Sequence, residues 1–308
     1  MAISRVLLFS ICLLLSGCLQ PHFPQTDLEP ALGERRIFAY QGVHINYYEA
    51  GQGRPVLLLH GFGACAYSWR FLAPALAREH RVIAMDLKGY GLSDKPRDGK
   101  YRVNDQADLV AAFIKAQELR EVTLIGHSMG GGVALQAYFQ VQCRDPACLR
   151  QLLLIDSAGY PQKLPWFIWM ARLPLLNPLL SRLLSARFAS ALVLKKCFYD
   201  RDQVTAEMVD TYAFYGSLPG AREAVLETAR QLVPADWAAV TARYRTINIP
   251  VLIIWGEEDT VVPLPVGRHF HRDIPGSQLV VIPNCGHIPQ EEDPGETTRL
   301  VQGFLKKN

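Results

Sequence analysis

The sequence predicts an α/β fold, with a mostly parallel central sheet, helices on both faces and an inserted helical segment. Short apolar runs that are typical of buried strands alternate with helix-length segments along most of the chain. This alternation stops at about residue 160 and returns at Pro250. The 308 residues are 49% hydrophobic, which is enough to bury one large core that carries an insertion.

The individual elements can be assigned from the pattern of apolar residues. Residues 35–49 alternate as in a two-strand hairpin, and the run VLLLH at 56–60 is typical of a fully buried strand. Further apolar runs predict strands at 81–85, 121–125, 151–155, 251–255 and 278–282. Helices are predicted at 67–79, at 103–119, from the glycines after 125 to about 142, at 264–271 and at 294–306.

The interruption of this pattern predicts a two-part organisation. We expect residues 34–159 and 241–308 to form the core, and residues 160–240 to form a helical cap. The segment 160–240 contains apolar helical stretches and no convincing strand. Such helices inside a globular chain usually bury their apolar face, which favours a cap packed over a site. Because arginines and lysines are interleaved among the apolar residues, contact with a membrane surface is the alternative.

The N-terminus has the pattern of an export signal over residues 1–17, with an early arginine, an apolar run at 6–15 and small residues after it. This run is too short to cross a bilayer, which takes about 20 residues. The stretch LSGC at 15–18 resembles the lipobox of bacterial lipoproteins, which implies cleavage before Cys18 and acylation of that cysteine. We therefore expect an exported membrane lipoprotein, in the outer membrane or facing the periplasm if the source has two membranes. Residues 18–33 would be a tether, and a plain signal peptide is the alternative.

Charge and glycine patterns exclude other classes of function. The 32 basic and 29 acidic residues give a net charge of +3 without long blocks, so no nucleic-acid partner is predicted. His269 and His271 are two apart on a predicted helix and point to different sides, so no metal site is predicted. The glycine loops do not fit a dinucleotide or phosphate loop, and no cofactor is expected.

Cysteine spacing leaves one question open. The segment CRDPAC at 143–148 could close a disulfide between Cys143 and Cys148, or hold two independent thiols.

The stretch IGHSMGGG at 125–132 predicts a nucleophile. GHSMG fits G-x-S-x-G and lies between a predicted strand and a predicted helix, which is the context of a nucleophile elbow. Small residues at 126 and 130 allow the strand and the helix to approach closely. Ser128 is therefore the candidate nucleophile, at a helix start whose free N–H groups face any developing charge.

Two residues near the C-terminus supply the base and the acid that a serine nucleophile needs. Asp259 follows the strand predicted at 251–255, and His287 follows the next strand, which gives the chain order Ser, Asp, His. Open parallel sheets carry their sites at the carboxyl ends of the strands. We expect His287 to take the proton of Ser128 and Asp259 to orient His287. The rival carboxylates are Glu257, Glu258 and Asp156.

The segment HGFGAC at 60–65 follows the first buried strand, and its glycines allow close approach to a substrate. We expect the backbone N–H groups of Phe62 and Met129 to form an oxyanion hole, with Gly63 as the rival of Phe62.

These motifs together resemble the α/β-hydrolase superfamily, from about Arg35 to the C-terminus. The shared stretches are HGFG, GHSMG, DLKGYGLSDKP at 86–96, WGEEDTVVP at 255–263 and CGHIPQEEDP at 285–294. The resemblance implies that Asp86 and Ser93 are structural, and that residues 160–240 match the family's helical cap between the sixth and seventh strands. Ser128 argues against the dehalogenase and epoxide-hydrolase branches, which carry an aspartate nucleophile.

Two positions bear on the reaction. The SW at 68–69 and the cap resemble carbon–carbon hydrolases of ring-cleavage products, which usually carry asparagine before the serine and tryptophan after the histidine. Here these residues are His127 and Ile288. We therefore expect a serine hydrolase that cleaves carboxylic esters through an acyl-enzyme, on a small-molecule ester with an apolar acyl or alcohol part. A carbon–carbon hydrolase, or a non-catalytic binding protein on the same scaffold, is the alternative.

Overall fold

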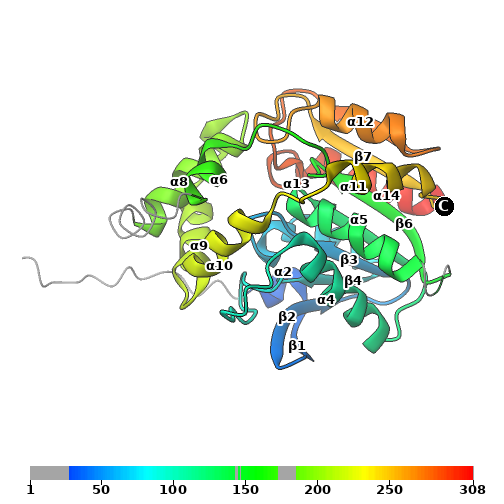
Figure 1. Ribbon diagram of the computed structural model, residues 1–308, viewed down its shortest axis with the longest axis horizontal. Helices are drawn as coiled ribbons and strands as arrows, with labels where there is room; N and C mark the ends of the chain where they lie inside the picture. Colours follow the sequence, from blue (N-terminus) through cyan, green and yellow to red (C-terminus); the bar gives the residue numbers. More distant parts are fainter. Residues whose placement is uncertain (1–27, 143–144, 146, 173–184, 308) are drawn as a thin grey trace, which may run out of the picture.

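The computed structural model describes residues 28–142, 145, 147–172 and 185–307. Its centre is a sheet of eight strands in the order β1-β2-β4-β3-β5-β6-β7-β8 (Figure 1). The antiparallel pairs are β1 with β2 and β2 with β4, and every other neighbouring pair is parallel. The strands are β1 (Glu34–Tyr40), β2 (Val43–Ala50), β3 (Pro55–Leu59), β4 (Arg81–Met85), β5 (Val122–His127), β6 (Leu149–Ile155), β7 (Val251–Gly256) and β8 (Gln278–Ile282). The predicted mostly parallel sheet is confirmed.

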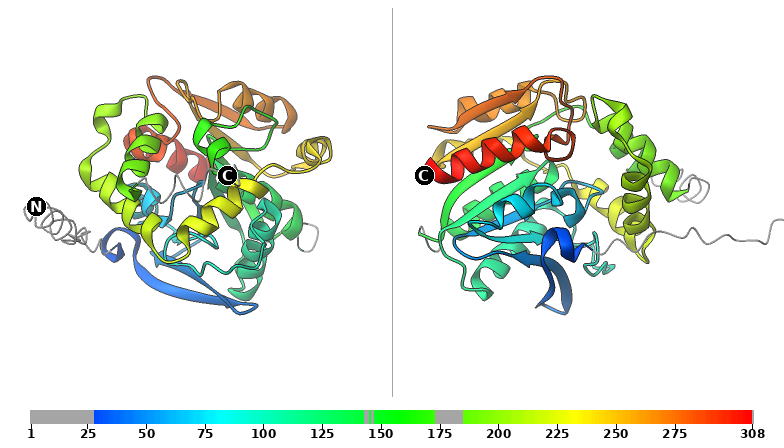
Figure 2. Two further views of the ribbon diagram at one scale, coloured as in Figure 1. Left: turned by 60° about the vertical axis from the view of Figure 1, so that its left-hand side comes forward. Right: turned by 180° about the vertical axis from the view of Figure 1, so that it is seen from behind.

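Helices cover both faces of this sheet. In Figure 1, α4 and α5 lie in front of the strands, and the rear view in Figure 2 brings α14 to the front. Every residue of β3, β5 and β7 is buried, as expected for strands covered on both faces. The core helices are α2 (Glu29–Leu32), η1 (Ala66–Trp69), α3 (Leu72–Leu76), α4 (Val103–Ala116), α5 (Met129–Gln142), α12 (Pro265–Asp273), α13 (Pro289–Glu292) and α14 (Pro294–Lys307).

The helix predicted at 67–79 is instead divided into η1 and α3. Pro74 lies in the first turn of α3, where its missing N–H has no intrahelical acceptor to lose. Farther inside a continuous helix, the ring of Pro74 would collide with the carbonyl group four residues earlier. The proline therefore explains why the helix begins at Leu72 and does not run through from residue 67.

Between β6 and β7, the described residues form helices and no strand. These helices gather at one side of the molecule, apart from α11, which lies along the core (Figure 1). Within this group α8 packs against α9, and α10 packs against both α6 and α9. The helices are α6 (Trp166–Ala171), α8 (Ala186–Cys197), η2 (Arg201–Gln203), α9 (Ala206–Ser217), α10 (Ala221–Gln231), α11 (Trp237–Ala242) and η3 (Arg243–Thr246). Residues 173–184 of the predicted cap lie outside the described residues.

The predicted signal segment and Cys18 also lie outside the described residues, as does Cys143. The end of the predicted tether differs from expectation, because Leu28 and Leu32 are buried in the core cluster. Four residues apart on one helical turn, these side chains share a face and pack on the domain. Among the helices that the structure describes, none has the length and apolar character needed to cross a membrane.

Candidate active site

Ser128 directly follows β5 and precedes α5, at the carboxyl edge of the sheet. Its φ angle is +52°, a left-handed conformation that few residues other than glycine adopt. Neighbouring backbone holds this turn: the Ser128 N–H donates to the Ile155 carbonyl at 2.9 Å, and the Ser128 carbonyl accepts from Ala158 and Gly131 at 3.0 Å. Strain of this kind persists where the surroundings determine it and is frequent at active sites.

The glycines around Ser128 have separate steric reasons. A Cβ atom at Gly126 would meet the backbone of Gly130, and one at Gly130 would meet the carbonyl group of Leu59. A Cβ at Gly131 would meet the side chain of Ser157, at the start of the loop after β6. Side chains at these three positions would push helix α5 away from the sheet, so the glycines allow the elbow to form.

The structure brings Ser128, His287 and Asp259 together in one chain of hydrogen bonds. The distance from His287 Nε2 to Ser128 Oγ is 2.9 Å, and His287 Nδ1 lies 2.7 Å from Asp259 Oδ2. The other carboxylate oxygen of Asp259 accepts from the N–H groups of Val261 at 2.7 Å and Val262 at 2.9 Å. With Nδ1 donating to Asp259, Nε2 is left free to accept the hydroxyl proton of Ser128.

Burial separates Asp259 from its rivals. Glu257 and Glu258 are exposed, whereas Asp259 is 5% exposed. Asp156 is fully buried beside Asp259. A carboxylate oxygen of Asp156, a carboxylate oxygen of Asp259 and a ring nitrogen of His287 all lie within 4.8 Å of one another. Because both ring nitrogens of His287 and both oxygens of Asp259 already form hydrogen bonds, this cluster fits a proton-transfer chain better than a metal site.

The loop that carries His287 is clamped on both sides. The His287 N–H donates to the Cys197 carbonyl at 2.6 Å, and His127 Nε2–H donates to the His287 carbonyl at 2.7 Å. Glu292 accepts the N–H of Gly286 at 2.6 Å. Burial and the nearby His287 lower the pKa of His127 well below its ordinary value. His127 is therefore a neutral donor that positions the His287 backbone.

The HGFG loop is held against the nucleophile by His60. His60 Nδ1–H donates to the Gly61 carbonyl at 2.8 Å, and His60 Nε2 accepts the N–H of Leu87 at 3.0 Å. Burial lowers the pKa of His60 to about 4, so the ring is neutral at pH 7. A Cβ atom at Gly61 would approach Ser128 Cβ to 3.1 Å, which places this loop directly beside the nucleophile.

Two predicted oxyanion-hole donors belong to segments that meet at Ser128. Met129 is the first residue of α5, so its N–H has no acceptor within the helix. Phe62 lies in the loop whose Gly61 adjoins Ser128, and Gly63 follows with a φ of +73°. The choice between the N–H groups of Phe62 and Gly63 stays a prediction.

Asp86 accepts hydrogen bonds from three segments of the core. Its carboxylate accepts the N–H groups of Ala66 at 2.7 Å and Leu92 at 2.9 Å, and the side-chain amide of Asn46 at 2.9 Å. Ser93 Oγ–H donates to the Asp86 carbonyl at 2.6 Å. These contacts support the structural roles that the resemblance implies for Asp86 and Ser93.

A buried ion pair joins the helices between β6 and β7 to the core. Glu291 on α13 pairs with Arg70, and the Tyr212 hydroxyl of α9 donates to the same carboxylate. The Glu291 side chain is 0% exposed and that of Arg70 is 10% exposed. The Arg70 guanidinium also lies 4.0 Å from the centre of the Tyr67 ring. Burial raises the pKa of Glu291 above its ordinary value, against the opposing effect of Arg70.

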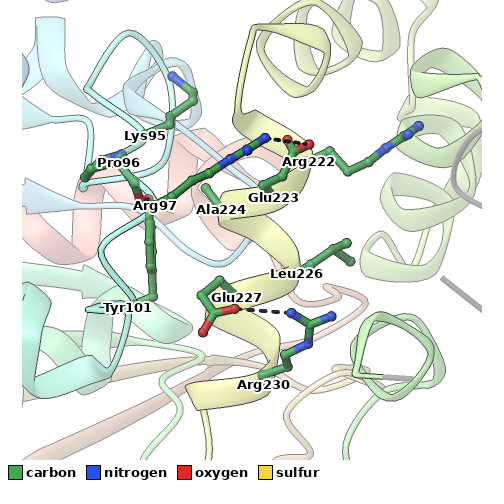
Figure 3. A pocket seen from close by; sticks show the side chains of 11 residues that line it. Lys95, Pro96, Arg97, Tyr101, Arg222, Glu223, Ala224, Leu226, Glu227 and Arg230 are labelled. Atoms are coloured by element: carbon green, nitrogen blue, oxygen red, sulfur yellow. Dashed lines mark hydrogen bonds and ion pairs between the residues drawn. The ribbon is translucent and has the colours of Figure 1, made fainter. Parts of the chain in front are cut away.

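A surface pocket of about 480 Å³ lies apart from these residues, between α10 and the loop at 95–101. Figure 3 shows Arg97 and Glu223 pointing toward each other and Glu227 facing Arg230, and both contacts are ion pairs. None of Ser128, Asp259 and His287 lines this pocket. We therefore place the chemistry at the sheet edge.

Four residues of this site have no role in the sequence-based predictions: His60, His127, Glu291 and Glu292. Each lies inside or next to a motif whose other residues drew attention, such as the glycines of HGFG or the histidine of CGHIP. The signal was present, because charged or polar residues beside buried strands need partners. Each of them has a partner at least 27 and at most 221 positions away in the chain, and sequence alone does not identify that partner.

A sequence model described as the alpha/beta hydrolase fold matches residues 54–294. The chain belongs to this family. This α/β-hydrolase is 31% identical over 283 residues to the 2-hydroxymuconate semialdehyde hydrolase of Pseudomonas sp. (strain CF600), covering 90% of the chain and 94% of that protein. It is 30% identical over 281 residues to the uncharacterized hydrolase YugF of Bacillus subtilis (strain 168), covering 90% and 99%.

A solved structure of a hydrolase is also similar to this chain. The meta-cleavage product hydrolase CumD of Pseudomonas fluorescens IP01 is similar with a TM-score of 0.74 and 28% identity, over 88% of this chain and 97% of that one. The resemblance to the α/β-hydrolase superfamily is thus confirmed, and the protein is a hydrolase. The 2-hydroxymuconate semialdehyde hydrolase and CumD belong to the class that the sequence predicted as the alternative to an esterase.

Proposed function

We propose that this α/β-hydrolase cleaves a carbon–carbon bond beside a carbonyl group in a ring-cleavage product, through an acyl-enzyme on Ser128. The observation that carries the proposal is the hydrogen-bonded chain from Ser128 through His287 to Asp259, at 2.9 and 2.7 Å. Relatives of this kind that are about 30% identical over about 90% of the chain support the choice of bond.

Each residue of the chain then has one task. Asp259 holds the Nδ1–H tautomer of His287, whose Nε2 takes the proton of Ser128 as Oγ attacks the substrate carbonyl carbon. The N–H groups of Met129 and Phe62 would stabilise the negative charge that develops on the carbonyl oxygen. The intermediate collapses when the carbon–carbon bond breaks and the departing carbon receives the proton from His287. Water, activated by His287, then hydrolyses the acyl-enzyme.

The departing carbon sets a requirement on the substrate. A carbon atom leaves readily only if the electron pair of the broken bond is delocalised. A carbonyl group conjugated to the departing carbon supplies this delocalisation. The 2-hydroxy-6-oxo-dienoic acids named for the relatives acquire it when their enol tautomerises to a 2-oxo-3-ene, which moves the hydroxyl proton to C5, the carbon that departs. We therefore expect a conjugated oxo-acid as substrate, bound under the helices between β6 and β7.

Carboxylic ester hydrolysis is the second candidate, and one observation favours it. An oxo-dienoate carries a carboxylate, which binds best beside an unpaired cation. Arg70, the buried arginine nearest in sequence to the HGFG loop, is already paired with Glu291. A neutral ester needs no such cation. The same residues would then form and hydrolyse the acyl-enzyme, with an alcohol as the leaving group.

A fluorophosphonate probe and two substrates test these proposals. We expect the probe to label wild-type protein and not Ser128→Ala, and we expect hydrolysis to fall by about 10⁵ or more in that variant. Ser217→Ala is the matched control, since Ser217 is an exposed serine at the end of α9. A kcat/KM for a chromogenic oxo-dienoate well above that for nitrophenyl esters supports carbon–carbon cleavage, and the reverse order supports the esterase. Equal behaviour of wild type and Ser128→Ala overturns both and leaves a non-catalytic binding protein.

We also propose that Cys18 carries a lipid anchor, which the LSGC stretch supports. Cys18→Ser should release the protein from the membrane fraction of its host. Cys12→Ser, inside the predicted signal, is the matched control and should leave membrane association unchanged. A Cys18→Ser variant that stays on the membrane contradicts the anchor.

A further inference from the structure

A second carboxyl group lies behind the triad acid. Asp156 directly follows β6, as Ser128 directly follows β5, and it also has a positive φ, +42° against +52°. The Asp156 N–H donates to the Ile254 carbonyl at 3.0 Å, and its carboxyl oxygen Oδ1 accepts the N–H of Gly256 at 3.0 Å. Pairing of β6 with β7 thus holds Asp156 against the end of β7, in a strained conformation that is typical of functional positions.

Carboxyl oxygens of Asp156 and Asp259 lie within 4.8 Å of each other, and two carboxyl groups this close cannot both be ionised without strong repulsion. Asp259 accepts three N–H donors, from Val261, Val262 and His287. Asp156 accepts one, from Gly256. The carboxylate with more donors keeps the negative charge, so Asp259 is the anion and the shared proton remains on Asp156.

The titratable groups around Asp156 come from three segments of the chain. Asp259 lies on the loop after β7, Glu292 on α13, and Cys285 and His287 on the loop after β8. Burial raises the pKa of Asp156 well above its ordinary value, and the Asp259 and Glu292 carboxylates add to this effect.

We propose that Asp156 is a positioning residue of this hydrolase: it is a neutral carboxylic acid at pH 7 that donates a hydrogen bond to the carboxylate of Asp259. This inference rests on the proposed function and adds to it a fourth member of the hydrogen-bonded chain. The donated bond disperses the charge of Asp259 and limits how strongly Asp259 stabilises protonated His287. Asp156 therefore acts on the base through the acid and does not touch the substrate.

Substitutions at Asp156 separate a neutral donor from an ionised one. Asp156→Ala removes the donor and leaves the Asp259 charge less dispersed. We expect kcat/KM to fall about tenfold and the acid limb of its pH profile to move to higher pH, because protonated His287 becomes more stable. Asp156→Asn restores a donor of the same shape, with its amide oxygen facing Gly256. We expect it to recover most of the lost activity and the wild-type position of the acid limb.

If Asp156 were ionised, its replacement would shift the acid limb of the pH profile in the other direction. Asp156→Asn would then remove a negative charge near His287 and move the acid limb to lower pH, and this result overturns the proposal. Infrared difference spectra of wild type against Asp156→Asn at pH 7 give a second measurement that does not need activity. A band of a protonated carboxylic acid in the wild type is expected, and its absence overturns the proposal. If Ser128 is not labelled by the fluorophosphonate, the proposed function fails while the spectra still test Asp156.

Discussion

The carboxyl edge of the sheet and the helices between β6 and β7 differ in how firmly their residues are held. At the edge, Ser128, Asp259 and His287 are at most 9% exposed and hydrogen bonds hold each of them. In the helical region, Trp169 and Phe188 are 55% and 56% exposed. The two regions meet where Glu291 and Glu292 bind residues of both. The edge thus holds its reacting side chains in a buried hydrogen-bond network, whereas the helical region exposes large apolar side chains at its surface.

The largest effect is expected within the edge. Asp259→Asn keeps the shape of the side chain but favours the wrong tautomer of His287, so kcat should fall by about 10⁴ with little change in thermal unfolding. Single-turnover hydrolysis with the preferred substrate measures the loss. Glu258→Gln, an exposed neighbour, is the control and should retain activity. A comparable loss in Glu258→Gln would contradict the assignment of Asp259.

A smaller effect is expected where the two regions meet. Glu291→Gln leaves the Arg70 guanidinium buried without its anion, and the free energy of unfolding should fall by about 3 kcal/mol. KM should rise more than kcat falls, because the helices above the site lose one of their attachments to the core. Chemical denaturation and steady-state kinetics measure the two changes.

Two variants control this experiment. Arg70→Met combined with Glu291→Leu removes both charges and should regain most of the stability. Trp169→Ala, on the exposed surface of α6, should change the free energy of unfolding by less than about 0.5 kcal/mol. If Glu291→Gln and Trp169→Ala behave alike, the ion pair does not hold the two regions together.

The pH dependence of the free energy of unfolding tests whether His60, beside the nucleophile, is held neutral in the folded protein. His60 has a folded pKa of about 4 against an ordinary value of 6.5, because burial favours the neutral ring. Between these values the unfolded chain binds a proton that the folded chain does not, so stability falls as the pH decreases from 6.5 to 4. The shift corresponds to about 3 kcal/mol.

The matched measurement compares wild type with His60→Gln, by urea unfolding at several pH values in this range. The variant should lose less stability on acidification than the wild type. His127 titrates with the same sign, so some dependence should remain in the variant. Parallel curves for the two proteins would show that His60 is not the group responsible.

Much of the fold and of the triad could be predicted because the relevant signals are local. Apolar runs for β3, β5, β6 and β7, and the glycines around Ser128, are properties of a few consecutive residues. The rule that parallel strands present their carboxyl ends at one edge then grouped Ser128, Asp259 and His287 without knowledge of distances. The helix predicted at 67–79 was wrong in extent, since Pro74 limits α3 to a later start.

The choice among carboxylates shows what local signals do not contain. Glu257, Glu258 and Asp259 are consecutive and similar in charge, and only the turn after β7 directs one of them inward. Likewise, Arg70 and Glu291 are 221 positions apart in the chain, and nothing in the sequence around either residue indicates that they form an ion pair.

The sequence by itself determined the alternation of strands and helices, the nucleophile elbow and the identity of the base, because each depends on neighbours along the chain. Tertiary structure alone excluded the rival carboxylates, and it alone decided which histidines stay neutral and that Asp156 lies against Asp259. Those properties depend on burial and on distances between residues from different strands. The order of residues along the chain does not contain them.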